Sequence, residues 1–349
     1  MRKQIIIICL LILGILGIGT YAFFNEGTTT HKEKTKKNLI SVGFAQVGAE
    51  SDWRSANSLS IKNSLTERKG FDLIFEDARQ MKQNQILSLR GFIQQNVDYI
   101  VFSPVVEDDY ESVLTEAKRA NIPVIIIDRK VADASDGLYT SWIGSDFRLQ
   151  GEKACACLKQ YIDNRKMKDV NIVNIQGTKG STSQRGRSDA LEKACKANGW
   201  NLVARETGEY TQTKSKEVMK EILKKTKDID FVYCENDNEA FGVIEALKEA
   251  GLRVGLGGDV QIISFDATKG GLKKTFEGEI LIDIECNPLQ GPKVKEVIDL
   301  LEKGGTPEKE YYIDEQVFVH EGIFDDIIVD GKVIPVIDVS TETYEKRKY

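Results

Sequence analysis

Two charged side chains stand at the end of the most apolar strand that the sequence predicts. The run Ile122-Pro-Val-Ile-Ile-Ile is mostly β-branched, which is typical of a parallel strand covered on both faces, and Asp128 and Arg129 follow it directly. Ligands of open α/β sheets bind beyond the carboxyl ends of the strands. A carboxylate accepts hydrogen bonds and a guanidinium donates several, so the pair suits an uncharged molecule with many hydroxyls, such as a sugar. An ion pair that merely closes the strand end explains the same residues.

Strand and helix patterns alternate in two successive runs that would position such a pair. The first run predicts strands at 39–46, 71–76, 98–102 and 122–127, with helices at 52–69, 84–95 and 108–120 between them. The second run predicts strands at 170–176, 200–205, 229–234, 260–266 and 279–286, with helices at 146–163, 186–198, 212–226, 237–250 and 268–277. Alternation of this kind indicates βαβ units and parallel sheets, so we expect an α/β protein with two similar lobes that share a cleft.

Composition excludes several function classes. The 349 residues allow two domains, and 41% apolar with 29% charged residues is the composition of a globular protein. A net charge of -6 offers no basic surface for nucleic acid. With only two histidines and no phosphate-binding loop, nucleophile elbow or C-x-x-C pair, we expect no catalytic residue, no metal, no cofactor and no enzymatic activity. The cysteines of the soluble part are expected to be buried free thiols.

The amino-terminal segment predicts a membrane anchor. Residues 5–24 carry no charge, and twenty residues at about 1.5 Å each span roughly 30 Å, the thickness of a bilayer core. We therefore assign 1–24 as an uncleaved signal-anchor and the polar stretch 25–38 as a stalk. The chain that follows is expected outside the cytoplasm, tethered to the membrane. A cleaved signal, which would leave the protein secreted, is the alternative.

One stretch near the start of the soluble part carries a family resemblance. Val42-Gly-Phe-Ala-Gln-Val-Gly-Ala-Glu-Ser-Asp-Trp-Arg54 resembles the beginning of the periplasmic sugar-binding proteins of ABC importers, of the ribose and galactose type, and is nearest to their galactofuranose-binding branch. The likeness extends over residues 39–310. It continues through these shorter motifs: Asp77, Asn84-Gln85, Ser103-Pro-Val-Val106, Asp128-Arg129, Gln176-Gly-Thr178, Asn236-Asp237 and Phe265-Asp266.

The resemblance implies a fold of two doubly wound parallel-sheet lobes, joined by three crossings, with a ligand cleft between them. By that pattern the amino-terminal lobe holds residues 39–143 and 287–306. The carboxy-terminal lobe holds residues 144–284 and 309–349.

The resemblance also implies a set of sugar-contacting residues drawn from both lobes. They are Glu50, Ser51, Trp53, Arg54, Asp128, Arg129, Arg187, Tyr210, Asn236, Asp266 and Glu285. Their types are compatible with this role, because aromatic rings cover the C–H face of a sugar while acids, amides and guanidiniums bind its hydroxyls.

Several of these residues have a structural alternative. Trp53 would also serve as a core aromatic, and Glu50 and Arg54 as a surface ion pair. Ser51 and Asn236 would also serve as helix N-caps. In addition, Arg185 could face the cleft in place of Arg187.

Two features depart from the family pattern. Glu285 is a carboxylate where many relatives carry an amide, which leaves the identity of the sugar open. Residues 323–339 do not match cleanly and predict an additional hairpin with Asp330-Gly331 as its turn.

The resemblance, together with the apolar amino-terminal segment, implies a monomeric, membrane-tethered solute-binding protein that captures a monosaccharide, either galactofuranose or a similar hexose or pentose. Hinge closure would enclose the sugar, and an ABC permease would receive it. A sugar sensor that presents its closed state to a membrane sensor kinase is the alternative. A transcriptional repressor would need a helix-turn-helix before residue 39, where the apolar segment stands instead.

Overall fold

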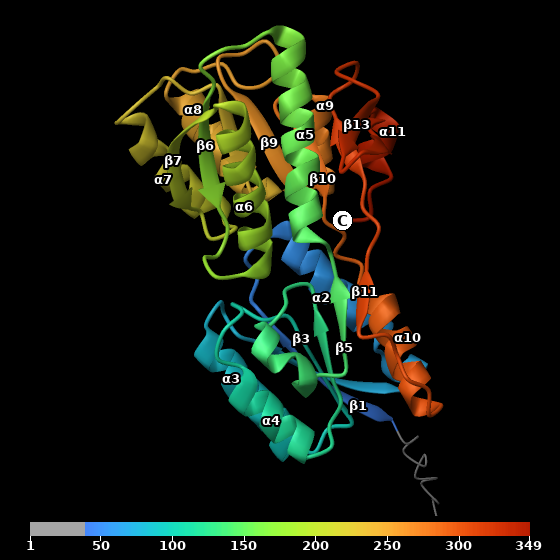
Figure 1. Ribbon diagram of the computed structural model, residues 1–349. Helices are drawn as coiled ribbons and strands as arrows, with labels where there is room; N and C mark the ends of the chain where they lie inside the picture. The colour runs from blue at the N-terminus through green and yellow to red at the C-terminus, as the bar shows by residue number, and fades with distance from the viewer. Residues whose placement is uncertain (1–38) are drawn as a thin grey trace, which may run out of the picture. The chain divides into compact units, whose positions relative to one another are not determined.

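The first group of buried apolar runs forms a six-stranded sheet. All of its pairings are parallel, and the strand order is β11-β5-β4-β3-β1-β2 (Figure 1). The strands are Ile40–Gln46 (β1), Phe71–Asp77 (β2), Tyr99–Phe102 (β3), Val124–Ile127 (β4), Ser141–Gly144 (β5) and Glu310–Tyr312 (β11). The run that precedes Asp128 is thus β4, in the middle of the sheet, and it is fully buried.

A second sheet holds seven strands in the order β15-β12-β10-β9-β8-β6-β7. The pairings from β7 to β10 are parallel, and β12 joins β10 in the antiparallel sense. The strands are Asn171–Gln176 (β6), Asn201–Thr207 (β7), Phe231–Cys234 (β8), Gln261–Asp266 (β9), Ile282–Glu285 (β10), Val317–Val319 (β12) and Ile337–Asp338 (β15).

Helices cover both faces of the first sheet. The pair α2 (Asp52–Ser64) and α10 (Gly291–Glu302) packs on one face, and α3 (Lys82–Gln94) with α4 (Glu111–Arg119) packs on the other. Each helix contributes an apolar stripe to the core, as the 3.6-residue period requires. This sheet and its four helices are called the first lobe below.

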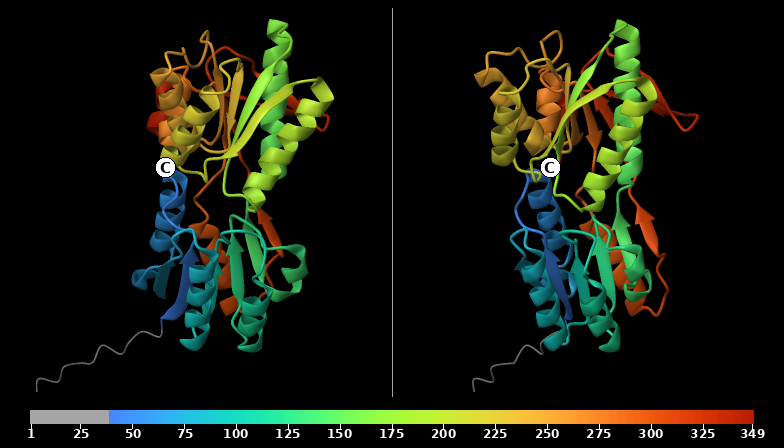
Figure 2. Two further views of the ribbon diagram at one scale, coloured as in Figure 1. Left: turned by 90° about the vertical axis from the view of Figure 1, so that its left-hand side faces the viewer. Right: turned by 60° about the vertical axis from the view of Figure 1, so that its left-hand side comes forward.

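The second sheet is covered in the same way. On one face lie α5 (Phe147–Arg165) and α6 (Thr182–Asn198), and on the other lie α7 (Gln212–Leu223) and α8 (Asp237–Glu249) (Figure 2). Two shorter helices, α9 (Lys269–Phe276) and α11 (Thr341–Glu345), share a small apolar cluster with β12. This sheet and these helices form the second lobe. Two 3-10 turns complete the elements, at Glu67–Lys69 (η1) and Asp133–Leu138 (η2).

Three segments connect the lobes: 145–146 after β5, 286–290 after β10, and 313–316 after β11. The position of the last segment differs from the sequence-based expectation, which assigned residues from 309 onward to the second lobe. Residues 310–312 instead pair with Trp142 to Gly144 at the edge of the first sheet. The Tyr312 ring packs edge-on against Trp142, with ring centroids 5.1 Å apart, so β11 covers an otherwise open strand edge.

The expected hairpin in the tail is confirmed. Strands β13 (Asp326–Val329) and β14 (Lys332–Pro335) pair antiparallel around a two-residue turn. Asp330 and Gly331 have φ angles of 48° and 74°, the left-handed values that a tight two-residue hairpin turn requires.

The computed structural model describes residues 39–349, and Ile40–Tyr349 form one compact unit. The expected anchor at 1–24 and stalk at 25–38 lie outside the described residues. Within 39–349, no helix combines the length and the apolar character needed to cross a bilayer.

Candidate functional site

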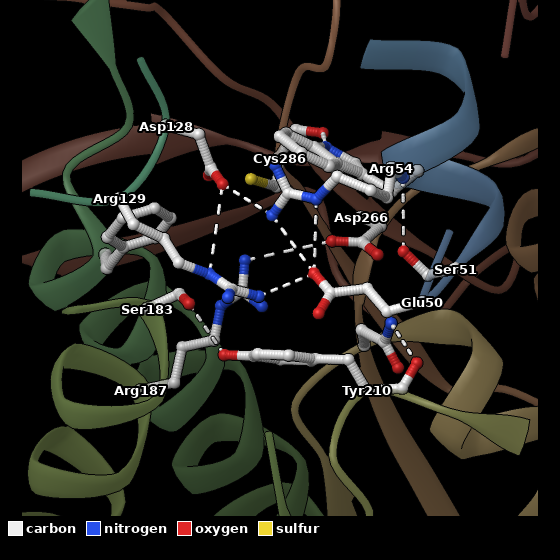
Figure 3. Close-up of a pocket in the computed structure, with 13 residues that line it drawn as sticks. Glu50, Ser51, Arg54, Asp128, Arg129, Ser183, Arg187, Tyr210, Asp266 and Cys286 are labelled. Atoms are coloured by element: carbon white, nitrogen blue, oxygen red, sulfur yellow. Dashed lines mark hydrogen bonds and ion pairs between the residues drawn. The ribbon is translucent and has the colours of Figure 1, made fainter. Parts of the chain in front are cut away.

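A pocket lies between the two lobes, at the carboxyl ends of the strands, and its empty space of about 260 Å³ includes space open to solvent (Figure 3). The lining residues come from both lobes and are mostly polar. They are Glu50, Ser51, Trp53, Arg54, Asp128, Arg129, Phe147, Ser183, Arg187, Tyr210, Asn236, Asp266 and Cys286.

The structure brings ten of the eleven sequence-predicted residues into this lining, and Glu285 is the exception. Glu285 ends β10, and its carboxylate faces residues 316, 347 and 349 instead of the pocket. Cys286, the next residue, lines the pocket in its place. Because successive side chains of an extended segment point to opposite sides, a shift of one residue decides which of the two faces the cleft.

The first lobe contributes a buried network of ion pairs. Arg54 donates to Asp128 over 2.6 Å and to Glu50 over 3.1 Å, and Arg129 donates to Glu50 over 2.6 Å. Burial by itself lowers the pKa of Arg54, but the charges of Asp128 and Glu50 more than offset it, so the pKa is raised and the guanidinium stays protonated. Asp128 and Arg129 are therefore both paired, with Arg54 and Glu50 respectively, and both also line the pocket.

Asp128 is held in an uncommon backbone conformation. Its φ of 59° lies in the left-handed region, which costs free energy for most residues other than glycine and less for Asp and Asn. The Trp142 indole donates to the Asp128 carbonyl over 3.1 Å and helps to hold this turn. The turn directs the carboxylate toward Arg54 and Ser103, and so to the pocket.

The start of α2 combines capping with pocket lining. Ser51 accepts from the Arg54 amide and caps the helix, as one alternative expected, and it also lines the pocket. The Trp53 indole donates to the Cys286 carbonyl over 2.6 Å, and the two side chains share a small apolar cluster with Phe147. Trp53 therefore joins the first lobe to the second crossing segment.

The second lobe offers Arg187 as its central cation. Its guanidinium donates to the Gln150 side chain over 2.8 and 3.1 Å and lies 3.8 Å from the Asp266 carboxylate. Arg185, the alternative, has a side chain that is 60% exposed and pairs with Glu107 at the rim. Of Arg185 and Arg187, therefore, it is Arg187 that faces the pocket.

Tyr210 and Asn236 complete this side of the pocket. The Tyr210 hydroxyl donates to Ser183 over 2.7 Å, and its ring lies 5.2 Å from the Arg129 guanidinium of the opposite lobe. Asn236 caps α8 through the Glu239 amide, donates to the Tyr210 carbonyl, and also lines the pocket.

Asp266 mirrors Asp128 at the end of a buried strand. It follows the apolar core of β9, and its φ of 106° again lies in the left-handed region. Burial raises the pKa of its carboxyl well above the ordinary value, while the neighbouring Arg187 acts in the opposite direction. Each lobe therefore presents a strand-end aspartate in an uncommon backbone conformation beside an arginine.

Sequence reasoning missed three lining residues: Phe147, Ser183 and Cys286. Ser183 lies one helical turn before Arg187 on α6, so helical spacing could have placed both on one face. Cys286 follows a strand end, where ligand-facing residues are expected. Phe147 is the first residue of α5, and its contact with Trp53 depends on the packing of the two lobes.

The carboxylate of Glu315 joins all three crossing segments behind the pocket. It accepts from the Ser145 hydroxyl over 2.6 Å, from the Asn287 amide over 2.8 Å and from the Gln150 amide group over 2.5 Å. Burial raises its pKa to about 7. Because Gln150 also accepts from Arg187, a continuous chain of hydrogen bonds runs from the pocket to the hinge.

Known proteins share this architecture. The profile of the periplasmic binding protein domain family matches residues 42–281, and the chain belongs to this family. The resemblance inferred from the sequence is thereby confirmed. The chain is 34% identical over 275 residues to the galactofuranose-binding protein YtfQ of Escherichia coli, which covers 77% of this chain and 85% of the relative.

Two solved structures are also similar to this chain in sequence and fold. One is a protein from Mycobacterium smegmatis in complex with β-D-fucofuranose, with 36% identity and a TM-score of 0.77 over 80% of this chain and 91% of that one. The other is the binding component of the arabinose ABC transporter from Shewanella sp. ANA-3, bound to α- and β-L-arabinofuranose. It shows 34% identity and a TM-score of 0.77 over 88% of this chain and 95% of that one.

Buried carboxyls around the pocket make the stability of the protein depend on pH. Glu235 holds the loop behind Tyr210 by accepting from the Gly177 amide over 2.9 Å, and burial raises its pKa from 4.5 to about 7. Between these two values the folded chain holds a proton that the unfolded chain has lost. The free energy of unfolding therefore falls as the pH rises from about 4.5 to about 7, and at about 1.36 kcal/mol per pKa unit Glu235 contributes roughly 3 kcal/mol.

We expect Glu235→Gln to remove this part of the pH dependence. Urea unfolding at pH 5, 6, 7 and 8 measures it, with Glu296→Gln as a control because that side chain is 67% exposed. Other buried carboxyls whose pKa values burial also raises keep a residual slope: Asp237, Glu239, Asp266, Asp283 and Glu315. Equal slopes in the Glu235 variant and the control would contradict the assignment.

Proposed function

We propose that this protein captures a monosaccharide between its two lobes and delivers it to an ABC importer. One observation carries the proposal: three arginines and three carboxylates from both lobes line one pocket, and all six side chains are buried. The arginines are Arg54, Arg129 and Arg187, and the carboxylates are Glu50, Asp128 and Asp266.

The balance of formal charge favours an uncharged guest. With Asp266 ionised, guanidiniums and carboxylates are equal in number, so the pocket offers many donors and acceptors but no net attraction for an anion or a cation. A sugar presents hydroxyls that both donate and accept, so it satisfies both kinds of group. Trp53, Tyr210 and Phe147 supply aromatic faces for its C–H surface.

Two buried polar atoms of the pocket support a polar guest. Oε2 of Glu50 and Nε of Arg129 make no hydrogen bond to any residue that the structure describes. Buried polar groups are nearly always paired, and an unpaired one costs about 1–3 kcal/mol. Hydroxyl groups of a bound sugar could accept from Arg129 and donate to Glu50.

The relatives favour a furanose as the sugar. By their descriptions, the three relatives named above bind galactofuranose, β-D-fucofuranose and L-arabinofuranose. We therefore propose a five-membered ring form of galactose, or of a similar hexose or pentose, as the ligand. Capture would take place outside the cytoplasm. Tethering through residues 1–24 and presentation to a sensor kinase stay predictions from the sequence.

Binding would work by closure of the two lobes. The lobes touch across the rim, where the Asp52 amide donates to Asn238 over 3.0 Å and the Lys130 amide donates to Thr182 over 3.1 Å. A guest held by both lobes stabilises this closed state, because an open state makes only half of its contacts. The chain of bonds from Arg187 through Gln150 to Glu315 connects guest binding to the hinge.

A calorimetric sugar panel tests the proposal. The full-length chain in mild detergent is titrated with D-galactose, L-arabinose and D-ribose, and with two deoxy sugars that fix the ring size. A pentose lacking its 5-hydroxyl closes only the furanose ring, and one lacking its 4-hydroxyl closes only the pyranose ring. We expect 5-deoxy-L-arabinose to bind and 4-deoxy-L-arabinose to give no heat. Binding of the pyranose form alone would refute the ring assignment, and absence of heat from every sugar would refute the function.

Replacing Asp128 tests its role in the pocket. We expect Asp128→Asn to weaken sugar binding at least tenfold, because a charged hydrogen bond is worth about 1.5–3 kcal/mol and about 1.4 kcal/mol is tenfold in affinity. Asparagine keeps the volume and tolerates the left-handed backbone, with φ 59° at this position.

Asp109→Asn is the matched control for that change. Asp109 also has a left-handed φ, 69°, but its side chain is 74% exposed and pairs with Lys82 outside the pocket. Calorimetry measures the sugar affinity of both variants, and the comparison is between two positions with similar left-handed backbone conformations. An affinity of the Asp128 variant equal to that of the control would exclude Asp128 from ligand binding.

A glycine behind Tyr210 offers an independent test. A Cβ at Gly177 would overlap the Tyr210 ring, whereas a Cβ at Gly137 would meet no atom within 4 Å. We expect Gly177→Ala to push the ring out of place and to weaken sugar binding by about tenfold or more, and Gly137→Ala to leave it unchanged. If Gly177→Ala binds as the parent does while remaining folded by circular dichroism, the Tyr210 ring does not contact the sugar.

A further inference from the structure

The segment after α11 docks on the wall of the pocket. Arg347 donates to the Glu285 carboxylate over 2.8 Å and to the Ala267 carbonyl over 2.7 Å. The Tyr349 hydroxyl donates to the same Glu285 oxygen over 2.8 Å, and the Tyr349 carbonyl accepts from the Lys269 amide over 2.5 Å. The C-terminus accordingly lies at the level where the two lobes meet in Figures 1 and 2.

The two segments that the tail holds are those that carry pocket residues. Asp266 immediately precedes Ala267, and Cys286 immediately follows Glu285. Through its carbonyl, Cys286 also accepts the Trp53 indole. A shift of either segment would therefore move groups that line the pocket.

The loop after β9 needs support from outside. Asp266 and Ala267 have φ angles of 106° and 50°, and two successive non-glycine residues in this region are strained. Both backbone polar groups of Ala267 are bound: its amide donates to Asp283 over 3.0 Å, and its carbonyl accepts from Arg347. The tail thus supplies one of the two bonds that hold Ala267.

Charge gives the same segment a second role. Glu285 is 4% exposed, and a buried carboxylate without a cation is costly. Among the described residues, Arg347 is the cation that forms an ion pair with Glu285 within 4.0 Å. The pairing keeps the negative charge of Glu285 turned away from the pocket, whose own charges already balance.

We propose that Arg347 and Tyr349 are positioning residues of the sugar site, which hold the Asp266 loop and neutralise Glu285 so that the pocket keeps its shape and its charge balance. This inference rests on the proposed function. It assigns a role in ligand recognition to a segment that contacts no pocket cavity directly.

Calorimetry with L-arabinose and D-galactose on full-length variants tests the inference. We expect Arg347→Ala to weaken binding about tenfold, because one cation serves both Glu285 and Ala267. The sugar affinity of Arg347→Lys should fall between those of the parent and of Arg347→Ala, because an ammonium lacks the planar fork that reaches both acceptors. Tyr349→Phe, which removes a single hydroxyl, should cost a smaller factor of about three.

Two further variants separate positioning from general stability. Lys346→Ala changes the neighbouring residue, whose side chain is 75% exposed and pairs with Glu342, and it should bind as the parent does. In the Glu285→Gln background, where no buried charge needs neutralising, Arg347→Ala should cost clearly less affinity than in the parent. A structural role alone would lower the thermal midpoint of the ligand-free protein but leave the affinity of the folded fraction unchanged.

The outcomes distinguish this inference from the function on which it rests. If the parent binds neither sugar, both are overturned. If the parent binds and the Arg347 variants match Lys346→Ala, the inference alone is overturned. If Arg347→Ala does not fold, Arg347→Lys and Tyr349→Phe decide, and parental affinity in both overturns it.

Discussion

Mutual neutralisation of buried charges is the constraint on which the site depends. Arginine and carboxylate groups removed from water are costly unless each finds an opposite partner and further hydrogen bonds. In this pocket the first lobe supplies Arg54, Arg129 and their two acids, and the second lobe supplies Arg187 beside Asp266. With Asp266 ionised, the charges that each lobe contributes to the pocket therefore cancel, and closing the cleft brings together two polar surfaces without a large net charge.

The architecture explains why these groups converge. In both lobes an aspartate ends a fully buried parallel strand, and in both its backbone turns into the left-handed region, at Asp128 and at Asp266. The carboxyl ends of parallel strands form one edge of each sheet, and the two edges face each other across the crossings. Helix starts add two N-cap residues to the lining. Ser51 caps α2 and Asn236 caps α8, and both side chains also line the pocket.

Much of this pocket lining could be predicted from the sequence, partly from local patterns and partly from the family resemblance. Asp128 follows a strand that a local pattern predicts, whereas Trp53 and Asn236 are assigned through the resemblance. The direction of the Glu285 side chain could not be predicted, because in an extended segment a shift of one residue turns a side chain to the opposite side. Its partners Arg347 and Tyr349 also lie 62 and 64 positions away in the sequence. The hinge carboxylate Glu315 and the placement of β11 depend likewise on long-range packing that no local pattern encodes.

A comparison of a neutral sugar with its acid tests the central claim most directly. The full-length chain is titrated calorimetrically with D-galactose and with D-galacturonate, which differs by one carboxylate in place of a hydroxymethyl group. A pocket with balanced charges should bind the neutral sugar and should bind the acid at least tenfold more weakly, because the added charge finds no unpaired cation. Tighter binding of galacturonate than of galactose would contradict charge balance as the basis of recognition.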